Sequence, residues 1–87
     1  NYLNCERHGD FVNIQGTFKT AASDVGYDAK LMDLPGWARP YDGMMSPIIG
    51  NDRTYKYIYV AKTGGMHAGD ILKGNQTYQV NMTYRIF

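Results

Sequence analysis

The amino-acid sequence predicts a small all-β protein, and three observations lead to this prediction. Apolar and polar residues alternate from Gln76 to Phe87, as in a strand with one buried and one exposed face. The same alternation recurs from Phe11 to Lys19 and from Tyr55 to Ala61, and turn-forming residues bound each segment. Eight tyrosines and ten glycines suit strands joined by tight turns, and no segment has the period of an amphipathic helix.

The first two predicted strands form a hairpin. They run from Tyr2 to Arg7 and from Phe11 to Lys19, and Gly9 lies in the turn between them, where it can adopt a positive φ. One face of the second strand is expected to point toward the core and comprises Val12, Ile14, Gly16 and Phe18. The small and polar residues from Thr20 to Gly26 then predict a loop.

Two shorter apolar segments occupy the middle of the chain. Tyr27 to Leu34 is predicted as a strand that stops before Pro35, since proline cannot donate to a ladder. Met44 to Ile49 is predicted as a strand interrupted by Pro47, which indicates an edge strand or a bulge. The residues of this strand expected in the core or in a subunit contact are Met44, Met45, Ile48 and Ile49.

Three further strands complete the prediction: Tyr55 to Ala61, Met66 to Leu72 and Gln76 to Phe87. A hairpin turn is expected at Lys62 to Gly65, and a turn into the last strand at Lys73 to Asn75. The face of the last strand expected in the core comprises Tyr78, Val80, Met82, Tyr84 and Ile86, and Phe87 is expected to be held in the sheet. About seven short strands at regular spacing predict one domain over residues 1–87, a small antiparallel β-sandwich or jelly-roll-like fold.

Length and charge limit the classes of function. A chain of 87 residues buries only about 60–65% of its extended surface, and small β domains often compensate by oligomerising. A net charge of +1 gives no electrostatic footprint for nucleic acid, and no apolar run is long enough for membrane insertion. The chain has no signal-peptide pattern and no initiator Met, so we expect it to be a fragment of a longer protein.

The residues that could support catalysis or metal binding are few. The single cysteine, Cys5, excludes an internal disulfide and a cysteine zinc site, and we expect it to be a small buried residue. His67 could gather an ion only as three copies on a trimer axis. A glycosidase needs two carboxyls roughly 5–9 Å apart, and nothing in the spacing of Asp52 and Asp70 requires them to meet. We therefore predict no enzyme activity, no catalytic residue, no metal and no cofactor.

Three motifs occur in a recognisable order. Arg7 to Gly16 (RHGDFVNIQG) opens the series, Leu31 to Pro40 (LMDLPGWARP) follows, and Lys73 to Tyr78 (KGNQTY) closes it. This order resembles the C-terminal receptor-binding head domains of bacteriophage tail and baseplate proteins, from phages of Gram-positive bacteria. The resemblance covers the chain from Arg7 to Phe87. In such heads the middle motif packs as a structural element, which implies a structural role for Trp37, Arg39 and Pro40.

The resemblance implies a compact homotrimeric β head at the tip of a tail fibre or baseplate arm. Such a head is part of the virion, adjoins other tail or baseplate proteins, and acts outside the host at the cell-wall polysaccharide. The chain departs from the resembled pattern at the sugar-contacting positions. Tyr57 and Tyr59 stand where those heads have His and Asp, Lys73 replaces an Arg, and Ala68 and Gly69 occupy the place of a Trp-Trp pair.

The candidate saccharide-binding residues lie late in the chain. A flat aromatic side chain covers the C–H face of a sugar ring, while charged and polar groups meet its hydroxyls. The set that meets this requirement is Tyr55, Tyr57, Tyr59, His67, Asp70 and Lys73. Charge-assisted bonds from Lys73 or Arg53 would suit a phosphorylated polysaccharide. The alternative is that the three tyrosines form a packed face or line a subunit interface.

Three functions therefore remain open on the sequence. The first is a non-catalytic head that adheres to host saccharide, with three sites per head raising the avidity. The second is a structural module that trimerises a tail fibre or docks another tail protein without touching the host. The third is a cellular lectin or fimbrial adhesin domain, against which a fully paired sheet in a closed trimer would argue.

Overall fold

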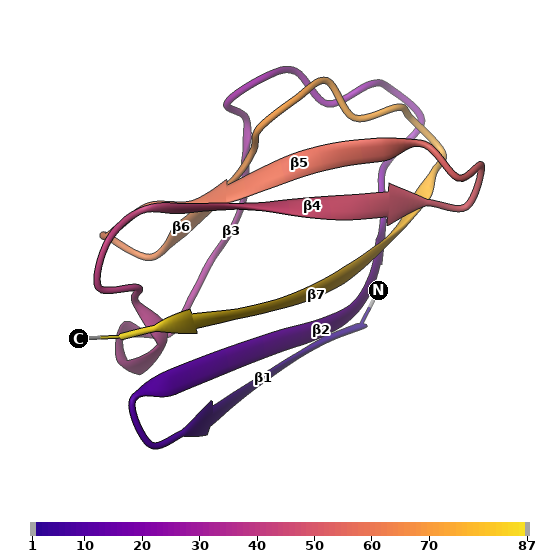
Figure 1. Cartoon of the computed structure of the whole chain (residues 1–87). Coiled ribbons are helices and arrows are strands. Elements are labelled where there is room, and N and C mark those ends of the chain that lie inside the picture. Colours follow the sequence, from indigo (N-terminus) through magenta and orange to yellow (C-terminus); the bar gives the residue numbers. More distant parts are fainter. Residues whose placement is uncertain (1, 87) are drawn as a thin grey trace.

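The computed structural model describes residues 2–86 and confirms an all-β protein of antiparallel strands (Figure 1). The elements are β1 (Tyr2–His8), β2 (Phe11–Lys19), β3 (Lys30–Asp33), the 3-10 turn η1 (Gly36–Ala38), β4 (Met44–Gly50), β5 (Tyr55–Val60), β6 (Gly65–Ala68) and β7 (Thr77–Arg85). Their order in space is β1-β2-β7-β4-β5-β6-β3, which is one continuous sheet. No described helix is long and apolar enough to cross a membrane.

The sheet curls around its own interior. A sandwich consists of two separate sheets, whereas here all seven strands belong to one sheet, with β1, β2 and β7 on one side of the interior and β4 and β5 on the other (Figure 1). The two outermost strands approach each other without pairing. Leu3 of β1 and Leu31 of β3 both line a hollow of about 400 Å³ that separates them. The fold is therefore a curled, open sheet.

The last strand joins the two parts of the sheet. β7 pairs with β2 along its whole length, from Phe11↔Arg85 to Lys19↔Thr77. On its other side β7 pairs with β4 at Ile49↔Gln79 and Gly50↔Tyr78. β7 thus connects the N-terminal hairpin to the strands from β3 to β6, and within residues 2–86 no other strand pairs with both parts of the sheet.

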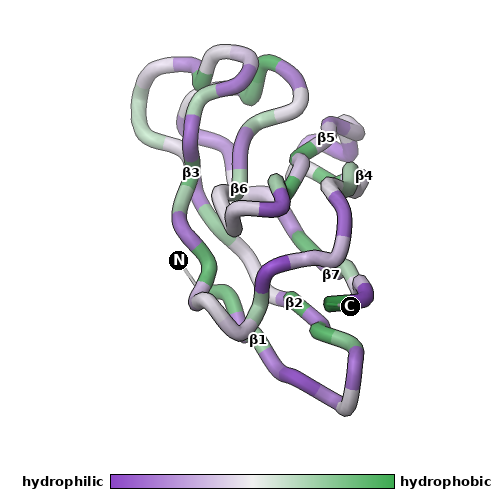
Figure 2. The backbone as a smooth tube through the Cα atoms, turned by 90° about the vertical axis from the view of Figure 1, so that its left-hand side faces the viewer, coloured by the Kyte–Doolittle hydropathy of each residue, from purple (hydrophilic) through white to green (hydrophobic). Residues whose placement is uncertain are grey.

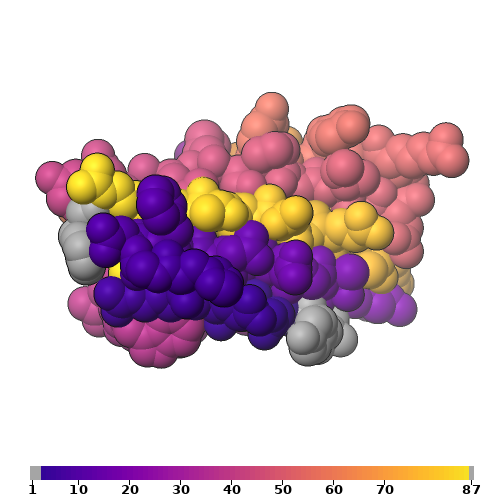
Figure 3. Space-filling model, turned by 60° about the horizontal axis from the view of Figure 1, so that its bottom comes forward, coloured from indigo at the N-terminus to yellow at the C-terminus, as the bar shows by residue number. Residues whose placement is uncertain are grey.

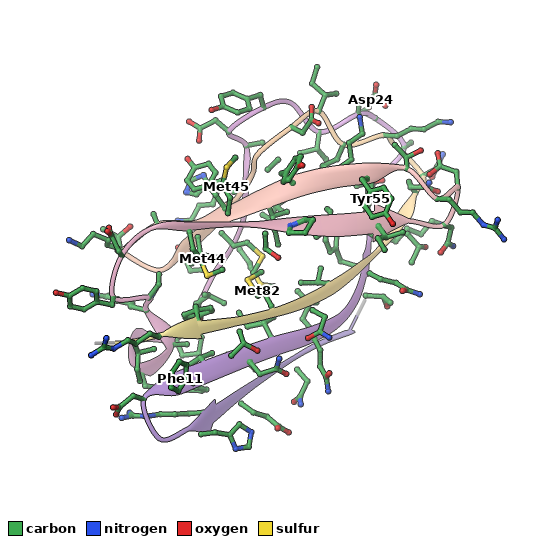
Figure 4. The ribbon with its side chains drawn as sticks, viewed as in Figure 1. Phe11, Asp24, Met44, Met45, Tyr55 and Met82 are labelled. Carbon is green, nitrogen blue, oxygen red and sulfur yellow. The ribbon has the colours of Figure 1, made fainter. Side chains whose placement is uncertain are left out.

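The predicted faces of β7 are confirmed. Burial alternates along this strand, with its even-numbered residues inside and its odd-numbered residues at the surface. Figure 2 shows the backbone from the side, with hydrophobic (green) and hydrophilic (purple) residues interspersed along the chain. The buried residues of the core are Val12, Ile14, Ala38, Ile48, Ile58, Val60, Met66, Ala68, Leu72, Tyr78, Val80, Met82 and Tyr84. Met44 and Met82 lie on the inner side, whereas Met45 lies on the outer side of the sheet (Figure 4).

Pro47 was predicted to mark an edge strand or a bulge, and β4 is neither an edge strand nor bulged against β5 at this residue. β4 lies between β7 and β5, and it pairs with β5 along nearly its whole length. Its ladder with β7 ends at Ile49, so the two strands have already parted at Pro47. Because Pro47 has no N–H group, it is tolerated at the point where β4 behaves locally as a free edge.

Two predicted strands are shorter than expected. The segment from Tyr27 to Leu34 becomes a strand only at Lys30, because Asp28 adopts a left-handed conformation with a φ of 68° that interrupts the extended chain. The segment from Met66 onward leaves the sheet after Ala68, and Leu72 then forms only an isolated bridge with Val25. Leu34 and Leu72 still pack at the core although the ladder stops, whereas Tyr27 and Ile71 are exposed.

The segment around η1 is attached to the core through its backbone. Ala38 is fully buried, and the hydroxyl of Tyr84 donates a hydrogen bond to the Ala38 carbonyl. Burial raises the pKa of Tyr84, which keeps this hydroxyl protonated as a donor. Pro40 is also buried, whereas Trp37 is 46% exposed and Arg39 lies over Gly64 at the surface.

The chain end is fixed beside the first hairpin. After β7, the N–H of Ile86 donates to the carbonyl of Asp10 over 2.9 Å. The expectation that Phe87 is held in the sheet falls on a residue outside the described part of the chain. Up to Ile86, the C-terminal segment is bonded to the turn between β1 and β2.

Replacing Met82 by Asp tests the assignment of the inner face. Met82 is 4% exposed, so Met82→Asp places a carboxyl among apolar side chains and is expected to destabilise the fold by at least about 3 kcal/mol. Thr83→Asp is the matched control, because Thr83 is exposed on the other face, and it should change stability by less than about 0.5 kcal/mol. Thermal unfolding followed by circular dichroism measures both; equal melting temperatures for the two variants would contradict the assignment.

Candidate functional site

The outer face of β4 and β5 bears an exposed row of aromatic and aliphatic side chains. The tyrosine stripe, as we name it, consists of Met45, Pro47, Ile49, Tyr55, Tyr57 and Tyr59. Strand register places these residues in three cross-strand pairs: Met45↔Tyr59, Pro47↔Tyr57 and Ile49↔Tyr55. Paired residues share a face, so the stripe is continuous across both strands.

The tyrosines of the stripe do not fill the core. Tyr55 is 66% exposed and Tyr57 is 47% exposed, which makes the packed-core alternative wrong for these two residues. The opposite face of β5 supplies Ile58 and Val60, both fully buried. The strand is thus fixed by its inner side chains, and its outer rings are presented to solvent on a rigid support.

One end of the stripe contains a polar cluster of three side chains. Tyr59 and His67 are cross-strand neighbours whose rings stack, with centroids 5.0 Å apart and planes 10° from parallel. The Tyr59 hydroxyl donates a hydrogen bond to the carboxylate of Asp28. The Nδ1 atom of His67 lies 3.2 Å from the backbone oxygen of Asp28 and 3.8 Å from its Oδ1. The three residues come from β5, β6 and the loop before β3.

The electrostatics of this cluster follow from the Asp28 carboxylate. Its hydrogen bond with Tyr59 raises the pKa of the tyrosine hydroxyl, because the proton is held by an anionic acceptor. Asp28 reaches this position through its left-handed backbone, and its N–H donates to the Ala68 carbonyl over 2.8 Å. A loop residue is thus held beside the stripe by a bond to β6.

Two of the predicted site residues lie apart from this cluster. Lys73 is exposed and close enough to Asp52, in the turn between β4 and β5, to help lower the pKa of that carboxyl; hydrogen bonds from Thr54 are the larger cause. Asp70 caps its neighbour, accepting a 2.7 Å bond from the N–H of Ile71. Both therefore interact with groups outside the polar cluster.

The predicted set is consequently divided along the sheet. The four residue steps along β5 from Tyr55 to Tyr59 span about 13 Å. Tyr59 and His67 lie at one end of this span, whereas Lys73 is near the β4–β5 turn beyond Tyr55. The structure brings Tyr55, Tyr57, Tyr59 and His67 onto one surface, and it does not gather all six predicted residues around one point.

The stripe borders a hollow at its Tyr59 end. Asp42, Met45, Tyr59 and Lys62 are among the residues that line this open space of about 500 Å³. Among residues 2–86, no group of three or more His, Cys, Asp or Glu side chains is arranged to hold a metal ion. What the arrangement offers is a set of flat ring faces beside hydroxyl, imidazole and carboxylate groups, which is suited to stacking and directional hydrogen bonding.

Some residues on this surface were not predicted from the sequence. Asp28 lies in a segment predicted as a strand, and only the pairing of β3 with β6 brings it to Tyr59. Met45 and Ile49 were grouped with Met44 and Ile48, although strict alternation along β4 places the two pairs on opposite faces. Applying the period of two to β4 would have identified Met45 and Ile49 as outward residues.

No protein-family model matches the chain, and no curated protein is significantly similar to it in sequence. The outer face combines exposed tyrosine rings, an adjacent polar cluster and a rigid β support.

Substituting Asp28 tests the cluster at the end of the stripe. Asp28→Asn removes the negative charge, and asparagine tolerates the left-handed conformation that this position requires. The pKa of Tyr59 is expected to fall toward the ordinary tyrosine value, because the anionic acceptor is lost. NMR titration of the tyrosine ring carbons measures the shift. Asp10→Asn, in the first turn, is the control and should leave the Tyr59 titration in place; an unchanged pKa in Asp28→Asn would contradict the hydrogen bond.

Proposed function

We propose that this domain is a non-catalytic adhesion head that binds saccharide on a host cell surface. The observation that supports this function best is the tyrosine stripe, in which two exposed rings lie on one face of a strand whose other face is core. Tyrosine offers a large flat contact area with few rotatable bonds, so little conformational entropy is lost on binding. The polar cluster at the end of the stripe supplies hydrogen-bonding groups for sugar hydroxyls.

The proposal extends to the assembly in which the head works. The order of motifs resembles receptor-binding heads of phage tails and baseplates, so the head is proposed to be a homotrimer in the virion, joined to other tail or baseplate proteins. A single shallow sugar site binds weakly. Three sites per head, with many heads per virion, raise the avidity by roughly 10²–10⁴ without any new contact.

Tyrosine substitution tests the adhesion proposal. Tyr55→Ala together with Tyr57→Ala removes both exposed rings on which a sugar could stack. The double variant is expected to adsorb to host cells or wall fragments at least tenfold more weakly than the wild type, while its melting temperature stays within a few degrees. Tyr41→Ala is the matched control, since Tyr41 is 64% exposed but lies under Arg85 away from the stripe. Equal adsorption by the double variant and the wild type, across host strains, would contradict the proposal.

A specific observation favours a structural role as the second candidate. Met45 and Ile49 are exposed aliphatic residues that make the stripe more apolar than hydrogen bonding to a sugar requires. Contiguous apolar surface of this kind marks interfaces between proteins. In this alternative the stripe is covered by a neighbouring subunit, and the module trimerises or caps a fibre without touching the host.

Oligomeric state distinguishes the two candidates. If the stripe is the subunit interface, Met45→Glu should convert the assembly to monomers, because a carboxylate would be buried in an apolar contact. If the stripe is the saccharide platform, Met45→Glu should leave the sedimentation mass unchanged. Thr83→Glu on β7 is the control, because Thr83 is exposed and lies outside the stripe. Analytical ultracentrifugation measures the mass of each variant.

A further inference from the structure

A second feature of the outer face lies where β4 and β7 separate. Their ladder ends at Ile49↔Gln79, and beyond this pair the strands diverge, leaving Pro47 and Asn81 on either side of the opening. The result is a surface groove of about 560 Å³, which we name the β4–β7 groove. Figure 3 shows this side of the molecule, with β7 running in a line between the residues of β2 and those of β4 and β5.

The two walls of the groove differ in chemistry. One wall presents amide side chains from β2 and β7: Gln15, Gln79 and Asn81. The other wall presents apolar side chains from β4 and β5: Pro47, Ile49 and Tyr55. Gln79, Ile49 and Tyr55 form one lateral row, because Ile49 pairs with Gln79 on one side and with Tyr55 on the other. Neighbouring strands are about 4.8 Å apart, so the amides and the ring lie within reach of one small ligand.

The amides on the polar wall are available to a ligand. Within residues 2–86, the side chains of Gln15 and Gln79 make no hydrogen bond to protein, and both are exposed. The Oδ1 atom of Asn81 accepts a 3.2 Å bond from Nδ2 of Asn13, which orients the Asn81 amide on the sheet. A side-chain amide has two N–H donors and a carbonyl acceptor, and a sugar hydroxyl can also both donate and accept. Either group can therefore donate a hydrogen bond to the other.

The lack of charge in the groove lining limits the chemical class of ligand that the groove can bind. All of its lining residues are uncharged, whereas Lys73 and Asp52 lie outside the lining. An anionic polymer would find no charge-assisted hydrogen bond here and would lose solvation on entering. A neutral sugar ring would place its C–H face on Tyr55 and Ile49 and its hydroxyl edge on the amides.

We propose that the β4–β7 groove is a binding subsite for an uncharged sugar residue. This inference rests on the proposed adhesion function. It adds a location on the surface and a chemical class of ligand, neither of which was predicted from the sequence. Tyr55 is shared by the groove and the tyrosine stripe, so a saccharide chain seated in the groove continues directly onto the rings of β5. The selectivity arises from the amide wall, which discriminates by hydrogen bonding and not by charge.

NMR titration with neutral and phosphorylated sugars tests this subsite. The probes are glucose, galactose, rhamnose and N-acetylglucosamine, each at high millimolar concentration, with glucose 6-phosphate as the charged counterpart of glucose. At least one neutral sugar should shift the side-chain amide signals of Gln15 and Gln79, and glucose 6-phosphate should shift them less than glucose does. Shifts at Tyr59 and His67 with silent groove amides would overturn the subsite and leave the adhesion proposal standing. Silence at every site would overturn the subsite, and failed adsorption to host cells would then remove the adhesion proposal as well.

Substitution of the amide wall provides the second arm. Gln15→Ala with Gln79→Ala removes the two free amides, and binding of the sugar that gives the largest shift should weaken about tenfold, as expected for two lost hydrogen bonds. Thr83→Ala is the control, because Thr83 is on the same face of β7 beyond the groove. Both Gln side chains are exposed, so the double variant is expected to fold, and unchanged amide signals in the core verify this. Wild-type affinity in the double variant would overturn the inference.

Discussion

The structure depends on one strand that serves two surfaces at once. β7 contributes four buried side chains to the core through its even-numbered residues, and its odd-numbered residues form the centre of the outer polar face. It is also the only strand among the described residues that pairs with both the N-terminal hairpin and the strands around β4. If its register slipped by one residue, every inner side chain would move to solvent, and the groove amide of Gln79 would enter the core. The register of β7 therefore determines both the folding of the sheet and the side chains that its outer face presents.

The sequence predicted those features that depend on local alternation and on turn chemistry. The strict period of two defined both faces of β7, and the glycine turns defined the hairpins before β2 and β6. Features that depend on long-range pairing were not accessible. Pro47 indicated an edge strand or a bulge, yet it lies inside the sheet at the point where β4 and β7 separate, which no local pattern encodes. Likewise, the curl of one sheet around its interior is a consequence of strand order, which an alternation pattern leaves open.

The candidate site shows the same division. Three tyrosines on alternate positions of β5 were correctly expected to share a face, because that follows from the pleat alone. His67 joins them through the β5–β6 ladder, whereas Asp28 joins through a left-handed loop residue, and Lys73 and Asp70 belong to other local contacts. The groove amides come from β2 and β7, which are far apart in the sequence from Tyr55. A binding surface assembled across four strands can be recognised only once their order is known.

Native-state hydrogen exchange tests the central role of β7 most directly. If β7 holds the two parts of the sheet together, its backbone amides and those of β2 facing it should be among the slowest to exchange and should open only with global unfolding. The amides of the outermost strands, β1 and β3, should exchange faster through local opening. Exchange of the β7 amides at the rates of β3, while β4, β5 and β6 remain protected, would contradict this account, because the strands around β4 would then be stable without their connection to the C-terminal segment.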